Sequence, residues 1–559
     1  MRITSIPQIY RNVNRWREIL SVLSKYGLAN WVSRLDLEFA KGLFKDPDGE
    51  ILARHRPETR IRLALSELGP TFIKLGQILS TRPDLVGTEL AAELQHLQTE
   101  VRADPPATVR ATIEIELGQP IEELFDEFDD RPLASASIGQ VHRAALKTGE
   151  KVVVKVLHAG IEDKVRVDLD ILVGLAQLAE MIPELANFRP RATVAEFQRI
   201  LRRELDFGRE ERHMQQFAHD FADDPTVHIP RVYPDFSTSR ALTMEYIEGV
   251  RLSEPARLAE AGFDLEEVAR RGAELYLTMM FTHGFYHADP HPGNVVLLPG
   301  NVIGLLDFGM VGRIDEQLRE TIEEMLAALL HRDAVHLTSL ITRVGTVPQQ
   351  LDQAALGLDV ADFVAHYGNL RLDDFDLGGA LSELMEMVRR YHILLPARVA
   401  MLIKVLIMLE GTSRLLSPRF SLIEVMQPFQ RKMIWRRFSP GRQARKLRRL
   451  VSELDYLVEV LPRGLVDILQ QVQSGRFDVH LDHRGLEPSV NRLVLGMLAS
   501  ALFLGSALLV SQKVEPFIPW PPVVEQLSVL GVTGCTISIL LGLRLLRAIN
   551  KSGHLDRRK

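Results

Sequence analysis

Three polar side chains in the middle of the chain have the types and spacing that phosphoryl transfer needs. Asp289 and Asn294 lie in the segment His287-Ala288-Asp289-Pro290-His291-Pro292-Gly293-Asn294, and Asp307 opens Asp307-Phe308-Gly309 after a short apolar run. This order is the layout of kinase-type sites. Magnesium prefers oxygen ligands, so Asn294 and Asp307 are candidate metal ligands, and Asp289 would orient the acceptor. A plain polar turn explains either half alone, but both halves in order favour a site for ATP and Mg²⁺.

An upstream phosphate-binding loop is predicted from the spacing Gly-x-Gly-x-x-Gly-x-Val, with alanine in the first two glycine positions. The candidate nucleotide-binding residues of this loop are Ala134, Ser135, Ala136, Ser137, Ile138, Gly139 and Val141. Alanine disfavours positive φ and adds a methyl group beside the phosphates, so we expect a stiffer loop. The apolar strand 151–156 follows, and its Lys155 could reach the α- and β-phosphates.

The elements that must position these groups can be located from hydrophobic patterns. Residues 303–306 predict a buried strand that delivers Asp307. A helix over about 193–217 has an apolar stripe flanked by Glu204 and Glu210. On the residues alone, plain surface charges are the better explanation of both carboxylates. The segment 242–249 is a plausible hinge, at which the backbone of Glu245 to Ile247 would bind adenine.

Two further motifs make the chain resemble the UbiB/ADCK (AarF-type) family of atypical kinase-like proteins. The first is Lys74-Leu75-Gly76-Gln77, which matches the family's Lys-x-Gly-Gln signature, and the second is Glu204-Leu205-Asp206, which matches its Glu-x-Asp segment. The resemblance implies that Lys74, Gly76 and Gln77 lie on a regulatory helix over the site, where Lys74 meets Glu204 and Asp206. It also implies a pair between Glu210 and Lys155. The family usually continues with Glu-Ala-x-Asn, whereas this chain has Glu210-Glu211-Arg212-His213.

The resemblance also implies a biological role, namely support of ubiquinone or other isoprenoid quinone synthesis. The expected partners are ATP and ADP, anionic membrane lipids, prenylphenol or other quinone precursors, and enzymes of quinone synthesis. Two alternatives remain open. A small-molecule or lipid kinase would share the spacing of Asp289 and Asn294 but release a phosphorylated product. A non-catalytic, nucleotide-dependent lipid-binding scaffold would bind ATP and tolerate Asp289→Asn.

The segment after Asp307-Phe308-Gly309 is too short to hold a protein substrate. Only residues 310–314 separate this motif from a helix predicted to open at Asp315-Glu316, and no Ala-Pro-Glu follows. The catalytic loop reads His-Ala-Asp, so the arginine that would gather an activation-loop phosphate is absent. We therefore expect a small molecule, a lipid headgroup or water, and not a protein, as the acceptor.

The predicted fold is α+β, a bilobal protein-kinase-like fold with a helical N-terminal extension and a C-terminal transmembrane helical hairpin. The extension covers 1–125 and carries the Lys-x-Gly-Gln motif. The N-lobe covers 126–245 with the alanine-rich loop and helix C, and the C-lobe covers 246–430 with the catalytic and metal-binding loops. A basic juxtamembrane segment, 431–490, precedes the two helices of 491–545.

Two uncharged apolar runs near the end of the chain predict a membrane anchor. Residues 493–510 and 527–543 would span about 27 and 26 Å as helices, against a hydrocarbon core of about 30 Å. A buried helical hairpin is the alternative. Arginine and lysine flank the outer ends of the pair, so the positive-inside rule places the kinase-like domain and the C-terminus on the cytoplasmic side of the inner membrane. Nine Lys or Arg and no acid between 431 and 449 favour contact with anionic lipid.

Composition narrows the remaining classes. The 559 residues exceed one ordinary domain, and 46% hydrophobic residues supply ample core. The net charge of −6 argues against nucleic acid as a partner. Cys535 is the single cysteine, which excludes an intrachain disulfide and fits a reducing compartment. The N-terminus lacks an apolar signal core, so we expect the kinase-like part not to be exported.

Overall fold

The computed structural model describes most of the chain as two units. The described residues are 13–28, 55–97, 101–181, 189–348, 350–370, 375–426, 429, 486–517 and 528–551. Unit 1 comprises Met1–Arg442 and unit 2 comprises Gln443–Lys559. The basic stretch 431–449, and most of the predicted juxtamembrane segment, lie outside the described residues.

The N-lobe is an antiparallel sheet in the order β1-β3-β4-β6, with β2 paired to β3. Its strands are β1 (Phe125–Phe128), β2 (Ala134–Ser135), β3 (Gly139–Leu146), β4 (Lys151–Leu157) and β6 (Ala241–Glu245). Side chains alternate along β4, so Val152, Val154 and Val156 form one core with α9 (Pro106–Leu117) and α10 (Ile121–Leu124). Val153 and Leu157 face the opposite side and join the main core. This parity aims Lys155 at the main core as well.

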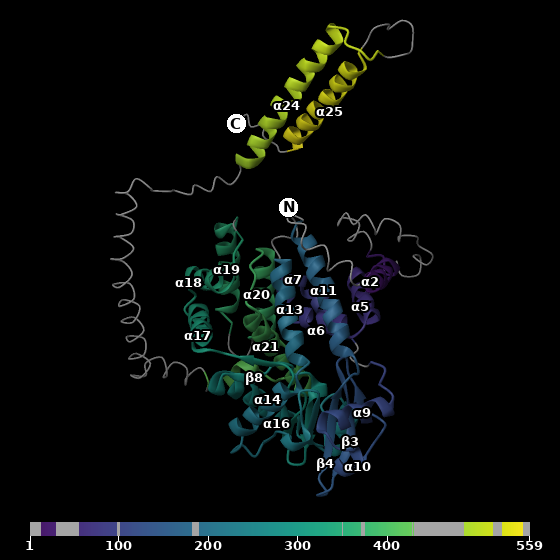
Figure 1. Cartoon of the computed structure of the whole chain (residues 1–559). Helices are drawn as coiled ribbons and strands as arrows, with labels where there is room; N and C mark the ends of the chain where they lie inside the picture. Colours follow the sequence, from purple (N-terminus) through teal and green to yellow (C-terminus); the bar gives the residue numbers. More distant parts are fainter. Residues whose placement is uncertain are drawn as a thin grey trace, which may run out of the picture. The chain divides into compact units, whose positions relative to one another are not determined.

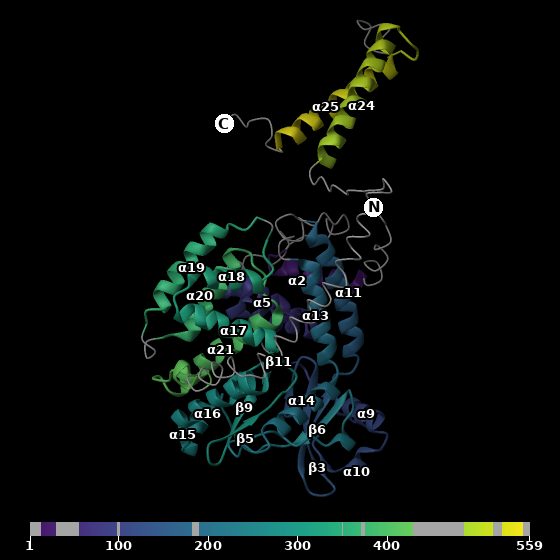
Figure 2. The same ribbon diagram turned by 90° about the vertical axis from the view of Figure 1, so that its left-hand side faces the viewer.

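The position of α9 and α10 bears on the domain division. Val109 and Ile113 of α9 and Ile121 and Leu124 of α10 pack with the sheet and not with the N-terminal helices. Figures 1 and 2 show α9 and α10 beside the strands. Residues 106–124 belong to the predicted extension by sequence, but their packing joins them to the N-lobe.

The helices of the extension pack on helices that leave the N-lobe sheet. The extension comprises α2 (Val13–Lys25), α5 (Pro57–Leu68), α6 (Pro70–Ser80), α7 (Pro83–Val86) and α8 (Thr88–Leu94). α11 (Ile161–Glu180), α13 (Pro190–Glu204) and α14 (Phe207–Asp220) follow the strands β3 and β4. The apolar faces of these helices share the main core, and Figure 1 shows α6, α11 and α13 next to one another.

The helix predicted over 193–217 is instead two helices, α13 and α14. Asp206 is extended, with φ −116° and ψ 93°, and the amide of Phe207 donates to the carbonyl of Ser239 at 2.8 Å. A tertiary hydrogen bond therefore interrupts a continuous apolar stripe. As a consequence, Glu204 ends one helix and Glu210 lies in the first turn of the next.

The C-lobe carries the catalytic segment on short strands. After α16 (Leu265–Thr278) come β8 (Phe285–His287), the 3-10 turn η4 (Pro292–Asn294), β9 (Val295–Leu298), β10 (Val302–Leu305) and β11 (Val311–Arg313). β10 pairs antiparallel with β9, and β11 pairs antiparallel with β8, so Val311 lies opposite His287. The strand predicted over 303–306 is confirmed as β10, displaced by one residue. It leads directly to Asp307.

Helices complete unit 1 on the side of the C-lobe. They are α17 (Glu316–Leu330), α18 (Ala334–Val344), α19 (Gln353–Tyr367), α20 (Leu377–Arg390) and α21 (Ala397–Leu416), and Figure 2 shows them gathered together. Asp315 caps α17 by accepting from the amide of Leu318, as its position before the helix predicts. α21 packs against α16, α20 and β11. Because β11 comes shortly after the Asp-Phe-Gly motif, α21 lies close to the catalytic region.

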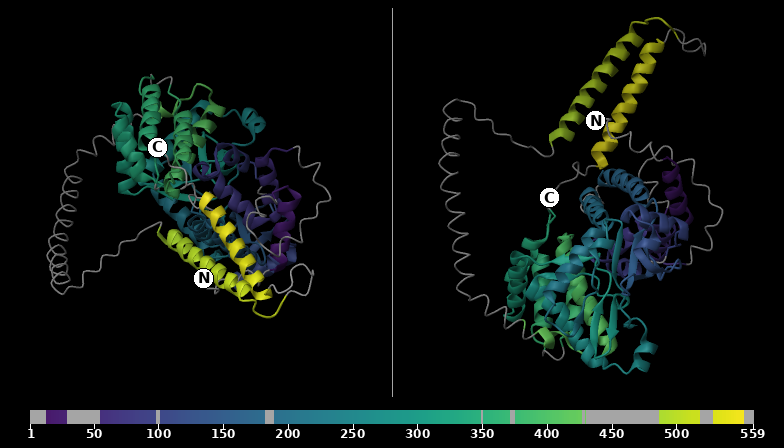
Figure 3. Two further views of the ribbon diagram at one scale, coloured as in Figure 1. Left: turned by 90° about the horizontal axis from the view of Figure 1, so that it is seen from above. Right: turned by 60° about the horizontal axis from the view of Figure 1, so that its bottom comes forward.

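Unit 2 is a hairpin of two helices, α24 (Leu486–Ser511) and α25 (Val529–Lys551), which lie side by side in both views of Figure 3. Small residues allow their close approach, because the Ser538 hydroxyl donates to the Ala499 carbonyl at 2.7 Å and Gly534 lies against Ser506. The stretches 492–511 and 529–547 are long and apolar enough to cross a membrane, by length and composition. The bilobal kinase-like fold with its helical extension and C-terminal hairpin is therefore as predicted.

Candidate active site

Lys155 forms the centre of a charged cluster between the lobes. Its ammonium lies 2.9 and 2.8 Å from the two carboxylate oxygens of Glu210 and 3.4 Å from Oδ1 of Asp307. Burial opposes the charge on Lys155, but the carboxylates of Asp307 and Glu210 outweigh burial and hold the pKa of Lys155 above its ordinary value. Lys155 is therefore a permanent cation facing Asp307, the candidate metal ligand. The predicted pair of Lys155 and Glu210 is present.

The ring of Phe207 also packs against the side chain of Lys155. The ammonium of Lys155 lies 5.1 Å from the centre of the Phe207 ring, within range of a cation–π contact. The ring also lies close to Gly139, where an added Cβ would approach Phe207 Cζ to 3.3 Å and the Val156 carbonyl oxygen to 2.4 Å. Because a side chain at the third glycine position of the phosphate loop would collide with the backbone of β4, glycine is needed there for the two backbone segments to pack closely.

The catalytic loop is held by His287. The amide of Asp289 donates to Nδ1 of His287 at 3.3 Å, while Nε2 donates to the carbonyls of Leu306 and Asp307 at 3.1 and 2.9 Å. These contacts assign the Nε2–H tautomer. A single buried imidazole therefore fixes the spacing between Asp289 and Asp307. The sequence placed His287 in the motif without giving it a role.

Asp289 and Asn294 lie together at the end of the same loop. Nδ2 of Asn294 donates to the Asp289 carboxylate at 2.8 Å and to the Asp289 carbonyl at 3.3 Å. This contact turns the Asn294 amide so that its oxygen is the atom left to a ligand, and in the described part of the chain that oxygen accepts no hydrogen bond. The candidate acceptor-orienting and metal-binding residues are thus neighbours.

Asp307 is held in a left-handed conformation, with φ 53°. Its neighbour Phe308 is clamped from both sides, because the Phe308 amide donates to Glu210 at 3.2 Å and the Phe308 carbonyl accepts from Nδ1 of His213 at 3.0 Å. The Phe308 ring is fully buried against Phe217. α14 therefore fixes the Asp-Phe-Gly segment through two residues one turn apart, and His213 does so from the position where the family usually has asparagine.

The donor set fits magnesium-bound ATP. The Asp307 side chain is 56% exposed and Lys155 holds its pKa below the usual range, so the carboxylate is ionised and accessible. Together with the Asn294 amide oxygen it offers hard oxygen ligands and leaves other positions to phosphate oxygens and water, as Mg²⁺ requires. Among the described residues no cluster of three His, Cys, Asp or Glu forms an all-protein cage. Such a cage is not needed where the metal arrives on a nucleotide.

The alanine-rich loop is fastened at several points. Its Ala136 amide donates to the Gly139 carbonyl, and its Ala136 carbonyl accepts from Nε2 of His158 at 2.9 Å. Asp104, in the linker that follows the extension, accepts from the Ala159 amide at 2.9 Å and lies 3.1 Å from Nδ1 of His158. The linker also bonds the loop directly, since the Val101 amide donates to the Ser135 carbonyl at 3.0 Å. The loop is therefore stiff, and it is tied to the extension.

The remaining loop positions form the start of the hairpin. Ala134 pairs with Val141 and Ser135 with Gln140, while Ser137 is buried and the Ile138 carbonyl accepts from the His158 amide. Gln140 is buried beneath the loop, where its side-chain oxygen accepts from the Asp104 amide at 2.7 Å. These contacts place the backbone of residues 134–139 over the β3–β4 hairpin that carries Lys155.

The predicted adenine hinge joins β6 to β7 (Val250–Arg251) and so links the two lobes. Two of its amides are already used, because Glu245 donates to the Arg231 carbonyl and Tyr246 to the Lys151 carbonyl. The Glu245 side chain contacts His228 at 3.0 Å. Within the described residues the Ile247 amide has no backbone partner. Of residues 245–247, Ile247 is therefore the one whose amide is available to a base.

Lys74 of α6 reaches the site from the extension. Its ammonium lies 2.6 Å from the carboxylate of Glu204, at the end of α13. Burial opposes the charge of Lys74, but Glu204, Asp307 and Asp289 outweigh burial and raise its pKa. Lys74 is thus a cation within electrostatic range of the two aspartates of the site. α6 consequently brings a positive charge close to both aspartates.

The rest of the two family motifs behaves differently from Lys74. The structure does not bring Asp206 to Lys74, because Asp206 follows the break after α13 and pairs with Arg212 at 3.7 Å. The predicted contact of Lys74 with both carboxylates is therefore correct for Glu204 only. Gly76 is packed against α8 and the segment after it, where an added Cβ would lie 2.2 Å from Leu97 Cδ1. The Gln77 amide makes no side-chain hydrogen bond to a described residue.

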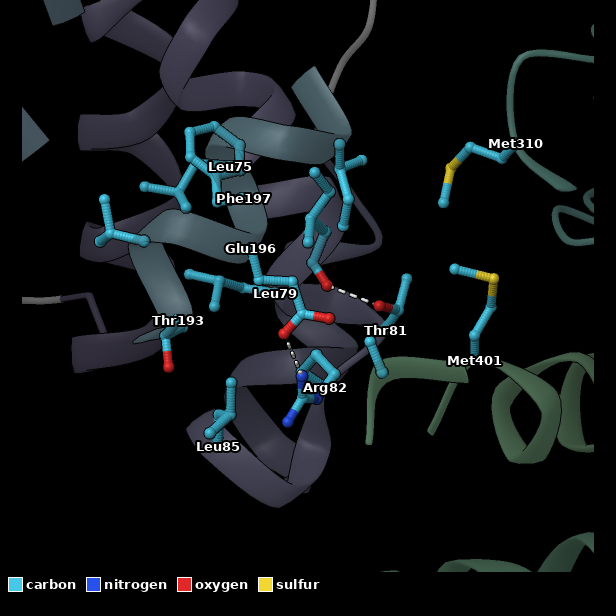
Figure 4. A pocket seen from close by; sticks show the side chains of 14 residues that line it. Leu75, Leu79, Thr81, Arg82, Leu85, Thr193, Glu196, Phe197, Met310 and Met401 are labelled. Carbon is cyan, nitrogen blue, oxygen red and sulfur yellow. Dashed lines mark hydrogen bonds and ion pairs between the residues drawn. The ribbon is translucent and has the colours of Figure 1, made fainter. Parts of the chain in front are cut away.

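A small apolar cavity adjoins this helix (Figure 4). Leu75 and Leu79 of α6, Phe197 of α13, Met310 after the Asp-Phe-Gly motif and Met401 of α21 line it, and its volume is about 40 Å³. Arg82 lies at its edge and pairs with Glu196 and Asp84. Apolar side chains from four parts of the chain therefore meet beside α6.

Comparison with known proteins agrees with this geometry. Residues 96–341 match the ABC1 atypical kinase-like domain, 360–421 the UbiB helical domain, and 480–551 the ABC1/UbiB kinase-like C-terminal domain. A probable protein kinase UbiB of Shewanella loihica is 34% identical over 458 residues, which are 81% of this chain and 83% of that protein. An uncharacterized protein from the hydrogenase 1 5' region of Clostridium pasteurianum is 29% identical over 553 residues, 97% and 100% of the two chains.

Another relative is the probable protein kinase UbiB of Azotobacter vinelandii, 34% identical over 472 residues, or 82% of this chain and 86% of that one. A solved structure described as the Rv3197–erythromycin complex from Mycobacterium tuberculosis has a TM-score of 0.44 at 25% identity, and covers 65% of this chain and 93% of its own. Three matched domains in order, and relatives aligned over most of their length, join the motifs and the charged cluster described above. The chain therefore belongs to the UbiB/ADCK family of atypical kinase-like proteins.

Proposed function

We propose that this protein is a membrane-anchored, magnesium-dependent ATPase that supports synthesis of ubiquinone or another isoprenoid quinone by handling lipid precursors. The observation that carries the proposal is the position of Lys74. This lysine of the extension lies against Glu204 and within electrostatic range of Asp289 and Asp307, so α6 covers the acceptor side of a site equipped to bind ATP. A peptide chain has no platform there, whereas water or a small lipid-derived acceptor can approach.

Each residue has a definite task in the proposed reaction. Mg²⁺–ATP would supply the phosphoryl group and a metal ion whose charge offsets that of the phosphate oxygens. Asp307 and the Asn294 amide oxygen would hold the metal, and Lys155, fixed by Glu210, would hold the α- and β-phosphates. Asp289 would orient the acceptor and take its proton as the new phosphorus–oxygen bond forms and the bond to ADP breaks. The stiff alanine-rich loop would cover the phosphates.

The membrane half of the proposal rests on the hairpin and its flanking charge. Both helices of unit 2 are long enough to span, and arginine and lysine follow the second one. We infer that the kinase-like domain faces the cytoplasm, beside the inner membrane in which quinone precursors dissolve. The names of the relatives in Shewanella and Azotobacter support the link to this pathway.

The test is phosphate release by the full chain in lipid nanodiscs, with neutral or acidic lipid and with or without a prenylphenol. We expect Mg²⁺-dependent ATP binding and hydrolysis by the wild type, and loss of both in Asp307→Asn, because that change removes the charge that holds the metal. Asp163→Asn, at an exposed aspartate of α11, is the matched control and should behave as wild type. Hydrolysis that survives in Asp307→Asn would contradict the proposed site.

The quinone role needs a cellular test. In a bacterium that lacks its own UbiB protein, the wild-type chain should restore the quinone content of the membrane, and Asp307→Asn should not, although it is produced at the same level. Restoration by both chains would show that nucleotide binding at this site is not the basis of the role.

A further inference from the structure

One face of α21, a helix of the C-lobe, is turned toward the site. Ala397 and Met401 line the apolar cavity together with Leu75 and Met310. Lys404 follows Met401 by three positions and therefore lies on the same face, one turn further along the helix. Figure 4 shows Met401 opposite the side chains of α6 and next to Met310. The face that carries Lys404 is thus the one that α21 turns toward α6 and the Asp-Phe-Gly segment.

The charges that act on Lys404 belong to the site. They are the carboxylate of Asp289, which attracts its ammonium, and the ammonium of Lys74, which repels it. Burial is the largest influence and lowers the pKa of Lys404, and Lys74 lowers it further, while Asp289 offsets part of this. Lys404 therefore lies within electrostatic range of Asp289 and Lys74, on the face of α21 that also carries Met401.

Lys404 differs from the other two lysines in having no carboxylate of its own. Lys74 pairs with Glu204 at 2.6 Å and Lys155 with Glu210 at 2.8 Å. In the parts of the chain that the structure describes, Lys404 has no hydrogen bond and no ion pair within 4.0 Å. An amino group that is partly desolvated and unpaired is costly to keep, so a purely structural role does not explain it.

The nearest carboxylate on the same helix does not supply the missing partner. Glu410 is buried, accepts from the Gly378 amide, and pairs with Arg414 at 3.0 Å. It ties α20 to α21 instead. Among the described residues, the ammonium of Lys404 therefore remains available to an anionic group.

We propose that Lys404 binds an anionic oxygen of the acceptor, beside the oxygen that Asp289 orients. This inference rests on the proposed function and names the substrate class of that site, an apolar molecule with an acidic group such as a carboxylate or a phosphate. The acidic group contacts Lys404, while the apolar part lies toward Met401 and Met310. The UbiB helical domain, which contains α21, thereby contributes directly to the site.

The test compares two matched probes by calorimetry on the full chain in phosphatidylcholine nanodiscs without nucleotide. One probe is a prenylphenol and the other is the same prenylphenol with a ring carboxylate. We expect the wild type to bind the carboxylated probe about tenfold or more tightly, as for a hydrogen bond to a charged group. Lys404→Met should abolish this preference and Lys404→Arg should retain part of it. Lys151→Met, at an exposed lysine of β4, should match the wild type.

Additional arms separate the sources of the anion and the possible failures. Nanodiscs with phosphatidylglycerol test a lipid headgroup as the source, since a headgroup at Lys404 should compete with the carboxylated probe in wild type but not in Lys404→Met. Binding of Mg²⁺–ATP within twofold of wild type shows that each variant is folded. A preference that persists in Lys404→Met, or is absent in the wild type, overturns the inference. Failure of ATP binding in the wild type overturns the proposed function instead.

Discussion

Removing Lys74 should destabilise the contact between the extension and the N-lobe far more than removing the whole Lys74–Glu204 pair. The two side chains are 14% and 6% exposed and lie 2.6 Å apart, and the second carboxylate oxygen of Glu204 has no partner already. Lys74→Ala therefore leaves a buried carboxylate unpaired, which costs about 3–5 kcal/mol. In the double variant Lys74→Met/Glu204→Leu no charge is stranded, so its cost should be about 1 kcal/mol or less.

Hydrogen exchange of the amides of α6 and α13 in the full chain measures this local stability without requiring reversible unfolding. A loss of 3–5 kcal/mol corresponds to exchange about a hundred- to several-thousandfold faster in Lys74→Ala, with recovery in the double variant. Exchange in α19, which is remote from the pair, provides the internal control. If Lys74→Ala and the double variant open α6 equally, the ion pair does not hold the extension over the site, and the argument from its burial is refuted.

Two other changes test the clamp on Asp-Phe-Gly and the phosphate loop. Burial lowers the pKa of His213, so the folded state favours the neutral imidazole. The contribution of His213 to stability is therefore present above its ordinary pKa of about 6.5 and is lost as the pH falls below that value. The variant His213→Asn should lose less thermal stability than the wild type between pH 7 and 5, measured without magnesium, and an unchanged pH dependence would contradict this expectation. Gly139→Ala places a methyl group 2.4 Å from the Val156 carbonyl oxygen, so it should reduce the folding stability by about 1–3 kcal/mol and weaken ATP binding. Gly411→Ala, in an open position on α21, should be neutral or stabilising. Equal effects of the two variants would refute the close packing of the loop.

The sequence alone predicts those parts of the site whose residues are close together in the chain. Asp289 and Asn294 lie on one loop between β8 and β9, and Asp307 lies shortly after β10, so their order already predicts their proximity. His213 could also have been found, because it lies three residues after Glu210 and therefore on the same face of α14. Its hydrogen bond to Phe308 shows why a histidine can stand where the family has asparagine.

The sequence pattern does not predict contacts between residues that are distant in the chain. The break between α13 and α14 depends on the Ser239 carbonyl, and an uninterrupted apolar stripe hides it. Lys74 and Glu204 are distant in the chain, so only the family resemblance suggested that they meet. Lys404 lies in an ordinary helix of the C-lobe and carries no local signal at all. In each case the tertiary environment, and not the propensity of the segment, decides the outcome.

The linker that bonds the alanine-rich loop has a mechanical consequence. Val101 donates a hydrogen bond to the loop at Ser135, and Asp104 contacts the neighbouring His158. In the chain, both residues follow α8 of the extension. Because these hydrogen bonds join residues 101–104 to the loop and to His158, a displacement of that segment would break them and loosen the loop. In the function that we propose, such a displacement would change the cover over the nucleotide phosphates without any rotation of the two lobes.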